Sequence, residues 1–424
     1  MRRLAHFASR SLAIAVLAMT SSLISLAQLW YVVTALGLNS ATDAFFISGA
    51  LPQFITAAFG NSLVTALLPA LTGDRADADR RARSAMIFVM LVIVSLAALF
   101  ALLMPWWAPL IAAGLPAEAH STLIACSRLQ LLAMVGTHFS LVASTHLQAR
   151  ERHVRIHATQ AFATLCSLGV TIAMVPHLGA SGAALAIAAR PWIECLGYPD
   201  SLMLMAKARS NGYWRELWTR TRGLCFAASY YKSDLLLDRF LASFAPAGDL
   251  SLLNMATRLN GVASQIVTRS LATPLVPPLA ATRDADGMPG VRARARRSML
   301  FLSGAGLLCA LGLIALGRTG FAGLFAINVF VEQDADRLWI LSMGLLGVLA
   351  ISPLGFFLSS ACFIIGRGDI VTRTGVVGFT AAICLKIALF QAMGILGIAL
   401  ATSAFFIGVA FAKWVWLERA MARK

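Results

Sequence analysis

The sequence has little charge and few residues suited to chemistry. Only 13% of its 424 residues are charged, and its seven cysteines and seven histidines are scattered. No two cysteines have the spacing of a metal or redox pair, so we expect no metal and no other cofactor. No glycine-rich loop continues into the Lys-Ser or Lys-Thr of a nucleotide site. Because no Ser-His-Asp or paired-carboxylate arrangement is placed for catalysis either, we expect the protein not to be an enzyme.

Long apolar stretches take up most of the chain instead. Hydrophobic residues make up 59% of the sequence, and the mean hydropathy is +0.77. A soluble domain does not need this much apolar surface, whereas a multi-pass membrane protein does. The net charge of +16 comes from short bursts of arginine between apolar runs, as in cytoplasmic loops. The composition therefore predicts an all-α integral membrane protein with no nucleic-acid partner.

A membrane-spanning helix needs about 20 apolar residues, and the chain offers twelve such segments. The expected spans are 11–36, 44–71, 85–108, 121–147, 157–177, 179–206, 222–246, 250–280, 297–317, 335–365, 372–391 and 394–416. With the N-terminus inside, the expected outer loops contain only Arg318 and Arg337 as basic residues. The positive-inside rule then places both termini in the cytoplasm.

Two sequence blocks recur at about half the chain length. SLVTALLPAL at 62–71 returns as SLATPLVPPL at 270–279, and GASGAALA at 179–186 returns as GILGIALA at 394–401. Because both halves would begin inside, the pattern predicts a parallel repeat of two six-helix lobes around a central cavity. We expect an N-terminal lobe at 1–206, a cytoplasmic amphipathic linker at 207–222 and a C-terminal lobe at 223–424.

Seven basic residues fall inside the expected spans, where a charge is costly and needs a partner or a water-filled cavity. They are Arg128, Arg190, Lys232, Arg239, Arg258, Arg269 and Lys386. Arg190 can be neutralised by Glu194, four residues along the same helix. For Arg128 the helix offers no acidic neighbour, so cavity lining and burial against a partner both stay open.

The expected seventh and eighth helices turn at 247–249, and Asp238 and Arg258 lie at equal distances from that turn. We therefore predict that these two side chains pair across the hairpin. The pair would belong to a transport site or would only lock the hairpin.

Three motifs resemble the lipid II flippase (MurJ/MviN-like) family of the multidrug/oligosaccharidyl-lipid/polysaccharide exporter superfamily. They are TDAFFISGALP at 42–52, FLASFAPAGDLSLLNMATRL at 240–259 and GRGDIVTRTG at 366–375. The resemblance covers essentially the whole chain. It implies a flippase in the bacterial inner membrane that moves a polyprenyl-pyrophosphate-linked saccharide by alternating access. That saccharide would be lipid II, or else an exopolysaccharide or O-antigen repeat unit. The implied partners are membrane lipids and the enzymes of peptidoglycan or polysaccharide biosynthesis.

The resemblance also implies site residues. Arg258 falls on the arginine of the family's eighth helix, and Asp43 on the aspartate of its TDAFF motif; with Arg128, these are the expected substrate-binding residues. The chain departs from the family where arginines are usual in the first two helices, and at the aspartate before the helix-8 arginine. The residues at these places are Ser22, Gln28, Thr56, Ala57 and Thr257.

Some family members bind sodium with acids of the seventh and eleventh helices. The helix-7 acids here are Asp234 and Asp238, whereas Lys386 stands at the helix-11 position. With Lys232 and Arg239, these residues form an expected coupling or charge network. An ammonium in the place of the ion predicts that sodium coupling is weakened or lost.

Two alternatives share this fold. A multidrug-type cation antiporter would have exposed acids in its cavity, whereas a carrier of anionic lipid-linked saccharides needs a cationic one. A divergent membrane partner that transports nothing would tolerate the loss of Arg258.

Overall fold

The computed structural model describes residues 2–72, 75–201, 212–325 and 331–422, although the side chains of 2–12, 284, 324 and 325 are not described. All regular secondary structure in these ranges is helical. This confirms the predicted all-α fold, in which helices satisfy their own backbone hydrogen bonds inside a bilayer. The expected cytoplasmic residues Lys207, Arg209, Arg423 and Lys424 lie outside the described ranges.

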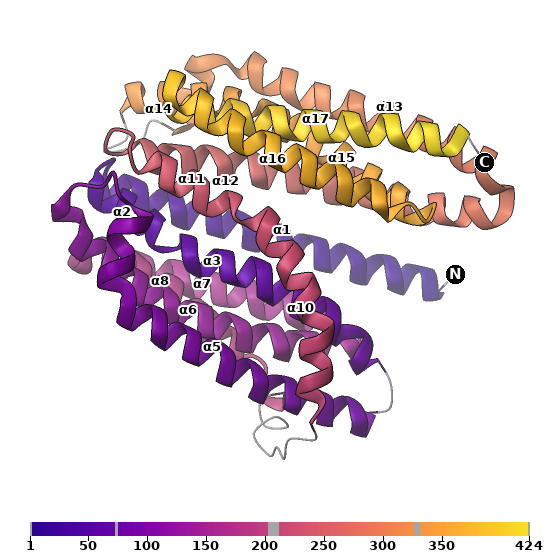
Figure 1. Ribbon diagram of the computed structural model, residues 1–424, viewed down its shortest axis with the longest axis horizontal. Coiled ribbons are helices and arrows are strands. Elements are labelled where there is room, and N and C mark those ends of the chain that lie inside the picture. The colour runs from indigo at the N-terminus through magenta and orange to yellow at the C-terminus, as the bar shows by residue number, and fades with distance from the viewer. Residues whose placement is uncertain (1, 73–74, 202–211, 326–330, 423–424) are drawn as a thin grey trace. The chain divides into compact units, whose positions relative to one another are not determined.

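The chain divides into two compact units, 1–248 and 249–424, and each is described here by itself. The first, unit 1, contains α1 (Arg2–Leu36), α2 (Ser40–Ser48), α3 (Ala50–Ile55), η1 (Thr56–Gly60), α4 (Asn61–Leu67), η2 (Leu68–Leu71), α5 (Arg75–Ile111), α6 (Ala117–Ala149), α7 (His153–Leu178), α8 (Ala180–Leu196), α10 (Tyr213–Lys232) and α11 (Asp234–Ala242). Within it, α6 packs between α5 and α8, and α7 packs between α1 and α8 (Figure 1).

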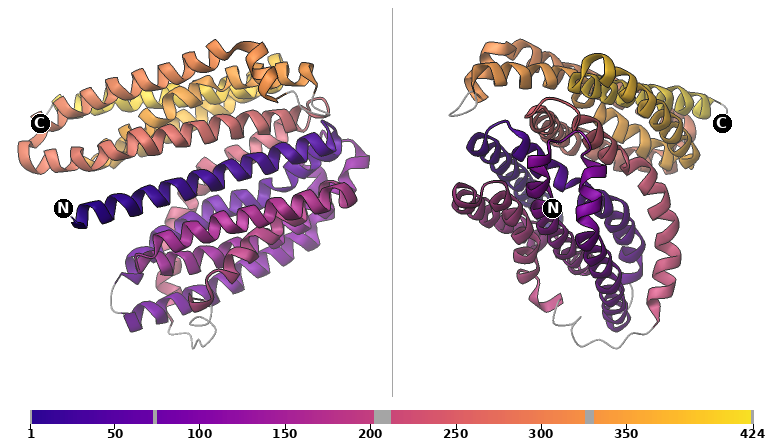
Figure 2. Two further views of the ribbon diagram at one scale, coloured as in Figure 1. Left: turned by 180° about the vertical axis from the view of Figure 1, so that it is seen from behind. Right: turned by 60° about the vertical axis from the view of Figure 1, so that its left-hand side comes forward.

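Unit 2 contains α12 (Asp249–Val267), η3 (Thr268–Ala272), η4 (Thr273–Leu275), α13 (Val276–Phe325), α14 (Glu332–Gly344), α15 (Leu346–Ile364), α16 (Gly368–Met393) and α17 (Ile395–Ala422). Figure 2 shows α13 and α15 to α17, coloured orange to yellow, running side by side. Gly287 and Gly317 interrupt α13, each with a φ of 64°, a conformation that glycine adopts without steric cost. The long helix between these two glycines contains the expected span 297–317 up to its last residue.

The boundary at 248 places α10 and α11 in unit 1, whereas the repeat had assigned 223–248 to the second lobe. By contacts, α10 packs against η1, α4 and α5, and α11 packs against α3. The described part of the expected linker, 212–222, forms the first turns of α10. The ring of Phe88 on α5 lies 6.5 Å from that of Trp214 and 6.1 Å from that of Trp218. These turns of α10 are thus packed on α5.

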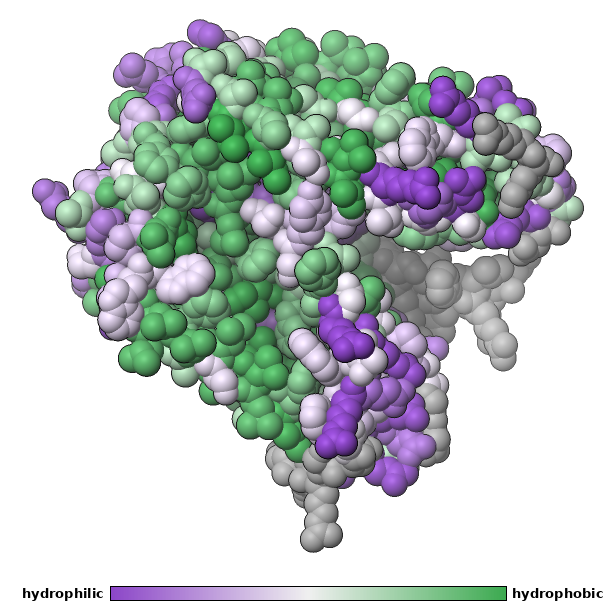
Figure 3. Space-filling view, in the orientation of Figure 1, coloured by the Kyte–Doolittle hydropathy of each residue, from purple (hydrophilic) through white to green (hydrophobic). Residues whose placement is uncertain are grey.

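Arginines gather at one end of each unit. In unit 1, Arg150 donates to Asp79 at 2.5 Å and Arg155 to Asp200 at 2.7 Å, and we call this the basic end of unit 1. In unit 2, Arg296 donates to Glu418 at 2.7 Å and Arg283 donates to the carbonyl of Ile364. Figure 3 shows hydrophilic residues toward the helix ends and hydrophobic residues over their middle parts. This is the distribution of a multi-pass membrane protein.

Eight helical stretches of the described residues are long and apolar enough to cross a membrane. They are Ala13–Leu36, Ser40–Leu71, Arg75–Ile111, His153–Leu178, Ala285–Gly323, Glu332–Ile364, Gly368–Met393 and Ile395–Ala422. The other expected spans correspond to α6, α8, α10–α11 and α12–η4. They contain Arg128, Arg190, Lys232, Arg239, Arg258 and Arg269, which are all the expected intramembrane basic residues except Lys386. The less apolar spans are therefore the ones that carry the charges.

The second repeated block has the same local structure in both units. Gly179 ends α7 with a φ of 57°, and Gly394 ends α16 with a φ of 60°. A Cβ on Gly182 would lie 2.5 Å from the carbonyl oxygen of Met174, and one on Gly397 would lie 2.1 Å from that of Leu389. In each unit, one glycine therefore makes the reverse turn, and the next lets two helix backbones meet.

Candidate functional site

One side of α12 and η3 carries polar or side-chain-free positions, which we call the α12 polar face. Its members are Asn254, Arg258, Gly261, Gln265 and Arg269. Steps of three and four residues keep them on one side of the helix. The other side packs against α14 and α15, and its buried residues are Leu253, Ala256, Asn260 and Ser264.

The α12 polar face is open and cationic. Arg258, Gln265 and Arg269 are exposed. A Cβ placed on Gly261 would have no atom within 4 Å, so the surface is not filled there. Because guanidinium groups are not left facing lipid tails, this face should line water or protein within the bilayer. Anionic groups are the ligands that such a face can hold. Sequence reasoning found Arg258 but missed Gln265 and Gly261, although their spacing was visible.

The helix that carries this face changes its pitch at the end. Thr268–Ala272 forms a π-helical turn that contains Arg269, and a 3₁₀ turn with Pro274 follows. Unit 1 shows the same order, with a π-helical turn at Thr56–Gly60 and then a 3₁₀ turn with Pro69. Such π turns are frequent at functional sites. The two helices in which the first repeated block lies therefore share an irregular backbone.

The corresponding helix of unit 1 has a neutral exposed face. Gln53, Asn61 and Thr65 are its exposed polar residues, in steps of eight and four. The departures Thr56 and Ala57 lie in the π turn between them. The side chains on this face can donate and accept hydrogen bonds but carry no charge.

The two other departures in unit 1 serve its internal packing. Gln28 is buried and donates to Ser167 Oγ at 2.9 Å and to Thr171 Oγ1 at 2.7 Å, which ties α1 to α7. The hydroxyl of Ser22 donates to the carbonyl of Ala18 in its own helix, at 2.9 Å. The side chain at 28 is therefore directed into the unit.

The predicted neutralisation of Arg190 is confirmed. Its Nε lies 3.2 Å from Oε1 of Glu194, and the other carboxylate oxygen accepts from Ser140 at 2.8 Å. Nη1 of Arg190 reaches the hydroxyl of Ser25 at 3.5 Å. This cluster joins α8 to α6 and α1, as a structural ion pair does.

Arg128 lies on α6 and is exposed. Within the described part of the chain, it has neither a hydrogen bond nor an ion pair. Its neighbours one turn away, Ala125 and Leu132, are exposed too. Arg128 is therefore not buried against a partner within unit 1, and its lining of a cavity stays a prediction.

The expected coupling residues fall in two places. Lys232, Asp234, Asp238 and Arg239 flank Ser233, where α10 bends into α11 (Figure 1). Lys232 is exposed, and the other three side chains are half-buried. Lys386 belongs to unit 2, where it is 1% exposed on α16. Because Asp238 and Arg258 also lie in different units, their pairing stays a prediction.

Asp43 has a local role that the sequence did not indicate. Its side chain is buried, and its Oδ2 accepts a hydrogen bond from the backbone N–H of Gly248 at 2.6 Å. Gly248 has a φ of 89°, and a Cβ there would lie 2.7 Å from that of Leu38. Asp43 therefore holds the turn that follows α11 against the end of α1.

Similar folds occur among solved membrane transporters. A lipid II flippase MurJ in an inward closed conformation matches with a TM-score of 0.82 and 14% identity, covering 96% of this chain and 87% of the other. An inward-facing multidrug resistance MATE family transporter of the MOP superfamily matches with a TM-score of 0.77 and 14% identity, covering 97% and 98%. A MOP superfamily transporter from Pyrococcus furiosus matches with a TM-score of 0.67 and 14% identity, covering 97% and 94%. These likenesses show the fold.

The sequence comparisons identify the family. A search of curated protein sequences finds no match. The sequence model described as lipid II flippase MurJ, however, matches residues 32–423, which is nearly the whole chain. This confirms the resemblance that the motifs carried and the prediction of a multi-pass membrane transporter rather than an enzyme. The chain belongs to the lipid II flippase MurJ family.

Proposed function

We propose that this protein translocates a polyprenyl-pyrophosphate-linked saccharide across the bacterial inner membrane by alternating access, with both termini in the cytoplasm. Membership of the flippase family supports the class of substrate. The observation that carries the proposal is the α12 polar face, which exposes Arg258 and Arg269 within an expected membrane span. A carrier of small cations would be opposed by these charges, whereas a pyrophosphate would be attracted.

Arg258 and Arg269 meet the substrate at different depths. Eleven residues separate them, which corresponds to about 16 Å along a helix. Arg258, nine residues after the start of α12, would hold the diphosphate within the bilayer. Arg269, in the π turn, would meet it near the end of the helix where the arginine-rich segment of α13 begins. Arg128 is a further phosphate contact in this proposal.

The same proposal includes a coupling scheme without sodium. Lys386 is fully buried on α16, and its ammonium would replace a bound cation. Asp234 and Asp238 would then respond to protons or to the membrane potential, which supplies about 2.3 kcal/mol per charge for each 100 mV. Transport by reconstituted protein should keep its rate when choline replaces sodium. A strict sodium requirement would contradict this scheme.

The test of the substrate class is flipping of a fluorescent polyprenyl-pyrophosphate saccharide by purified protein in vesicles. Arg258→Ala should reduce the rate at least tenfold, because a charge-assisted phosphate contact contributes about 1.5–3 kcal/mol. Arg258→Lys should restore part of it. Thr257→Ala is the matched control, since Thr257 is the exposed neighbour and its hydroxyl bonds only Leu253 of its own helix among the described contacts. Unchanged flipping by Arg258→Ala would contradict the role of Arg258, whereas no flipping by the wild type would favour a protein that does not transport.

A further inference from the structure

The basic end of unit 1 contains a cavity that the transport proposal does not use. It has a volume of about 470 Å³ and lies between the end of η2, the start of α5 and the end of α6. Its lining residues are Leu71, Thr72, Arg75, Ala78, His146, Ala149, Arg150, Glu151 and Arg152. Three of these are arginines, and they come from two segments far apart in the sequence.

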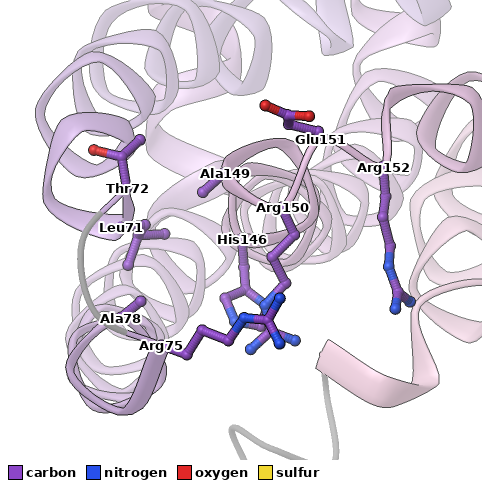
Figure 4. Close-up of a pocket in the computed structure, with 9 residues that line it drawn as sticks. All are labelled: Leu71, Thr72, Arg75, Ala78, His146, Ala149, Arg150, Glu151 and Arg152. Atoms are coloured by element: carbon purple, nitrogen blue, oxygen red, sulfur yellow. The ribbon is translucent and has the colours of Figure 1, made fainter.

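The charges of this cavity are unevenly matched. The acid next to the cavity is Asp79. Its Oδ1 accepts a hydrogen bond from Arg150 at 2.5 Å and lies 2.8 Å from Nε2 of His146. Arg75 is exposed and, among the described residues, has no hydrogen bond and no ion pair. Figure 4 shows the guanidinium of Arg75 directed toward that of Arg150 and the ring of His146. Asp79 is therefore shared by Arg150 and His146, and the charge of Arg75 has no acid opposite it among the described residues.

Of the described acids near the cavity, neither Asp200 nor Glu151 pairs with Arg75. Asp200 is bound by Arg155 at 2.7 Å, so Arg152 reaches it only at 3.7 Å. Figure 4 shows the carboxylate of Glu151 pointing away from Arg75 and Arg150. Glu151 is also the one non-glycine residue of the described chain with a positive φ, at 60°. That backbone costs of order 1 kcal/mol, and it accompanies the outward direction of the carboxylate.

We infer that this cavity binds a phosphate-bearing ligand. Guanidinium groups suit phosphate because their N–H groups match its oxygens in pairs. The cavity also lies at the depth of lipid headgroups, since His146 and Ala149 belong to the last turn of α6, which ends its expected span. Basic pockets at the cytoplasmic ends of membrane helices are places where anionic lipids bind. A phospholipid headgroup and a free phosphate share this chemistry, and the experiment separates them.

The experiment uses the purified full-length protein in a nonionic detergent, with native mass spectrometry to count bound lipid. Phosphatidylglycerol should bind in a saturable manner and more tightly than phosphatidylcholine of the same chain length. Arg75→Gln should weaken the binding of phosphatidylglycerol at least tenfold. The fold should persist in this variant, because the exposed Arg75 has no partner among the described residues. Arg80→Gln is the matched control, as it removes one exposed arginine from the same helix that pairs with Asp77 instead.

Inorganic phosphate identifies the source of the ligand. If phosphate displaces phosphatidylglycerol and chloride at equal ionic strength does not, the site takes soluble phosphate as well. If neither displaces it, the headgroup of an anionic lipid is the ligand. If Arg75→Gln and Arg80→Gln lost phosphatidylglycerol binding equally, the binding would reflect only a general field of positive charge, and the inference would be overturned. The inference would also be overturned if phosphatidylglycerol and phosphatidylcholine bound equally well and Arg75→Gln left this binding unchanged.

Discussion

Replacing Asp43 separates a structural role from a role in transport. Asp43 is 4% exposed, and its carboxylate accepts a hydrogen bond from the N–H of Gly248 at 2.6 Å. A hydrogen bond to a charged group contributes about 1.5–3 kcal/mol, and a buried donor left without a partner adds a cost of its own. The turn is closely packed, because a Cβ on Gly248 would lie 2.7 Å from that of Leu38. We therefore expect Asp43→Ala to lower the free energy of unfolding by about 2–3 kcal/mol.

The measurement is reversible unfolding in mixed micelles of rising sodium dodecyl sulfate content, followed by circular dichroism. Asp43→Asn keeps an oxygen acceptor, so it should lose about half as much stability as Asp43→Ala. Asn39→Ala is a local control: Asn39 caps α2 by accepting from the N–H groups of Ala41 and Thr42 at 3.0 Å, a contact that contributes about 1 kcal/mol. If Asp43→Ala unfolds like the wild type but no longer transports, the carboxylate acts on substrate or coupling, and the structural reasoning fails.

Three further changes have expected outcomes in the same unfolding assay. Gly397→Ala should lower the free energy of unfolding by about 1–3 kcal/mol, because the new Cβ is forced against the preceding helix. Gly408→Ala should leave it unchanged, because a Cβ there meets open space. Equal effects of the two variants would contradict the close approach at Gly397. Glu194→Ala should cost about 3 kcal/mol by leaving Arg190 without its acid, and replacing both residues by Met should recover most of that loss. Burial raises the pKa of Asp249 more than its arginine partner lowers it. The free energy of unfolding of the wild type should therefore fall as pH rises above about 4, and Asp249→Asn should remove this fall. Parallel plots of unfolding free energy against pH for the two proteins would refute the prediction.

Much of the fold could be predicted because its signals are one-dimensional. Apolar length predicted the spans, eight of which are matched by helical stretches long and apolar enough to cross a membrane. The placement of arginines predicted the grouping of charges at one end of each unit. The repeated blocks predicted a duplicated frame, and the structure shows why they recur. Gly179 and Gly394 must adopt positive φ, while Gly182 and Gly397 must admit a neighbouring backbone. Such positions have few alternatives, so the sequence repeats them.

The side-chain partners could not be predicted, because they depend on how each helix is rotated about its axis. Arg190 and Glu194 were found because a spacing of four fixes the geometry within one helix. Asp43 and Gly248 are 205 residues apart, and no spacing rule connects them. Gln28 stands where the family has an arginine, but its bonds to α7 became visible only with the helices in place.

The two units differ where their shared frame is most alike, and under the proposed function this difference bears on the substrate. A polyprenyl-linked saccharide has two polar parts: sugar hydroxyls, which need donors and acceptors, and a diphosphate, which needs cations. The exposed face of α2 to α4 offers Gln53, Asn61 and Thr65, whereas the α12 polar face offers Arg258 and Arg269. Both helices contain a π turn followed by a proline-bearing 3₁₀ turn. A duplicated backbone thus carries neutral polar groups in one unit and guanidinium groups in the other, and under the proposed function the guanidinium groups would suit the diphosphate. A carrier of simple cations needs neither set.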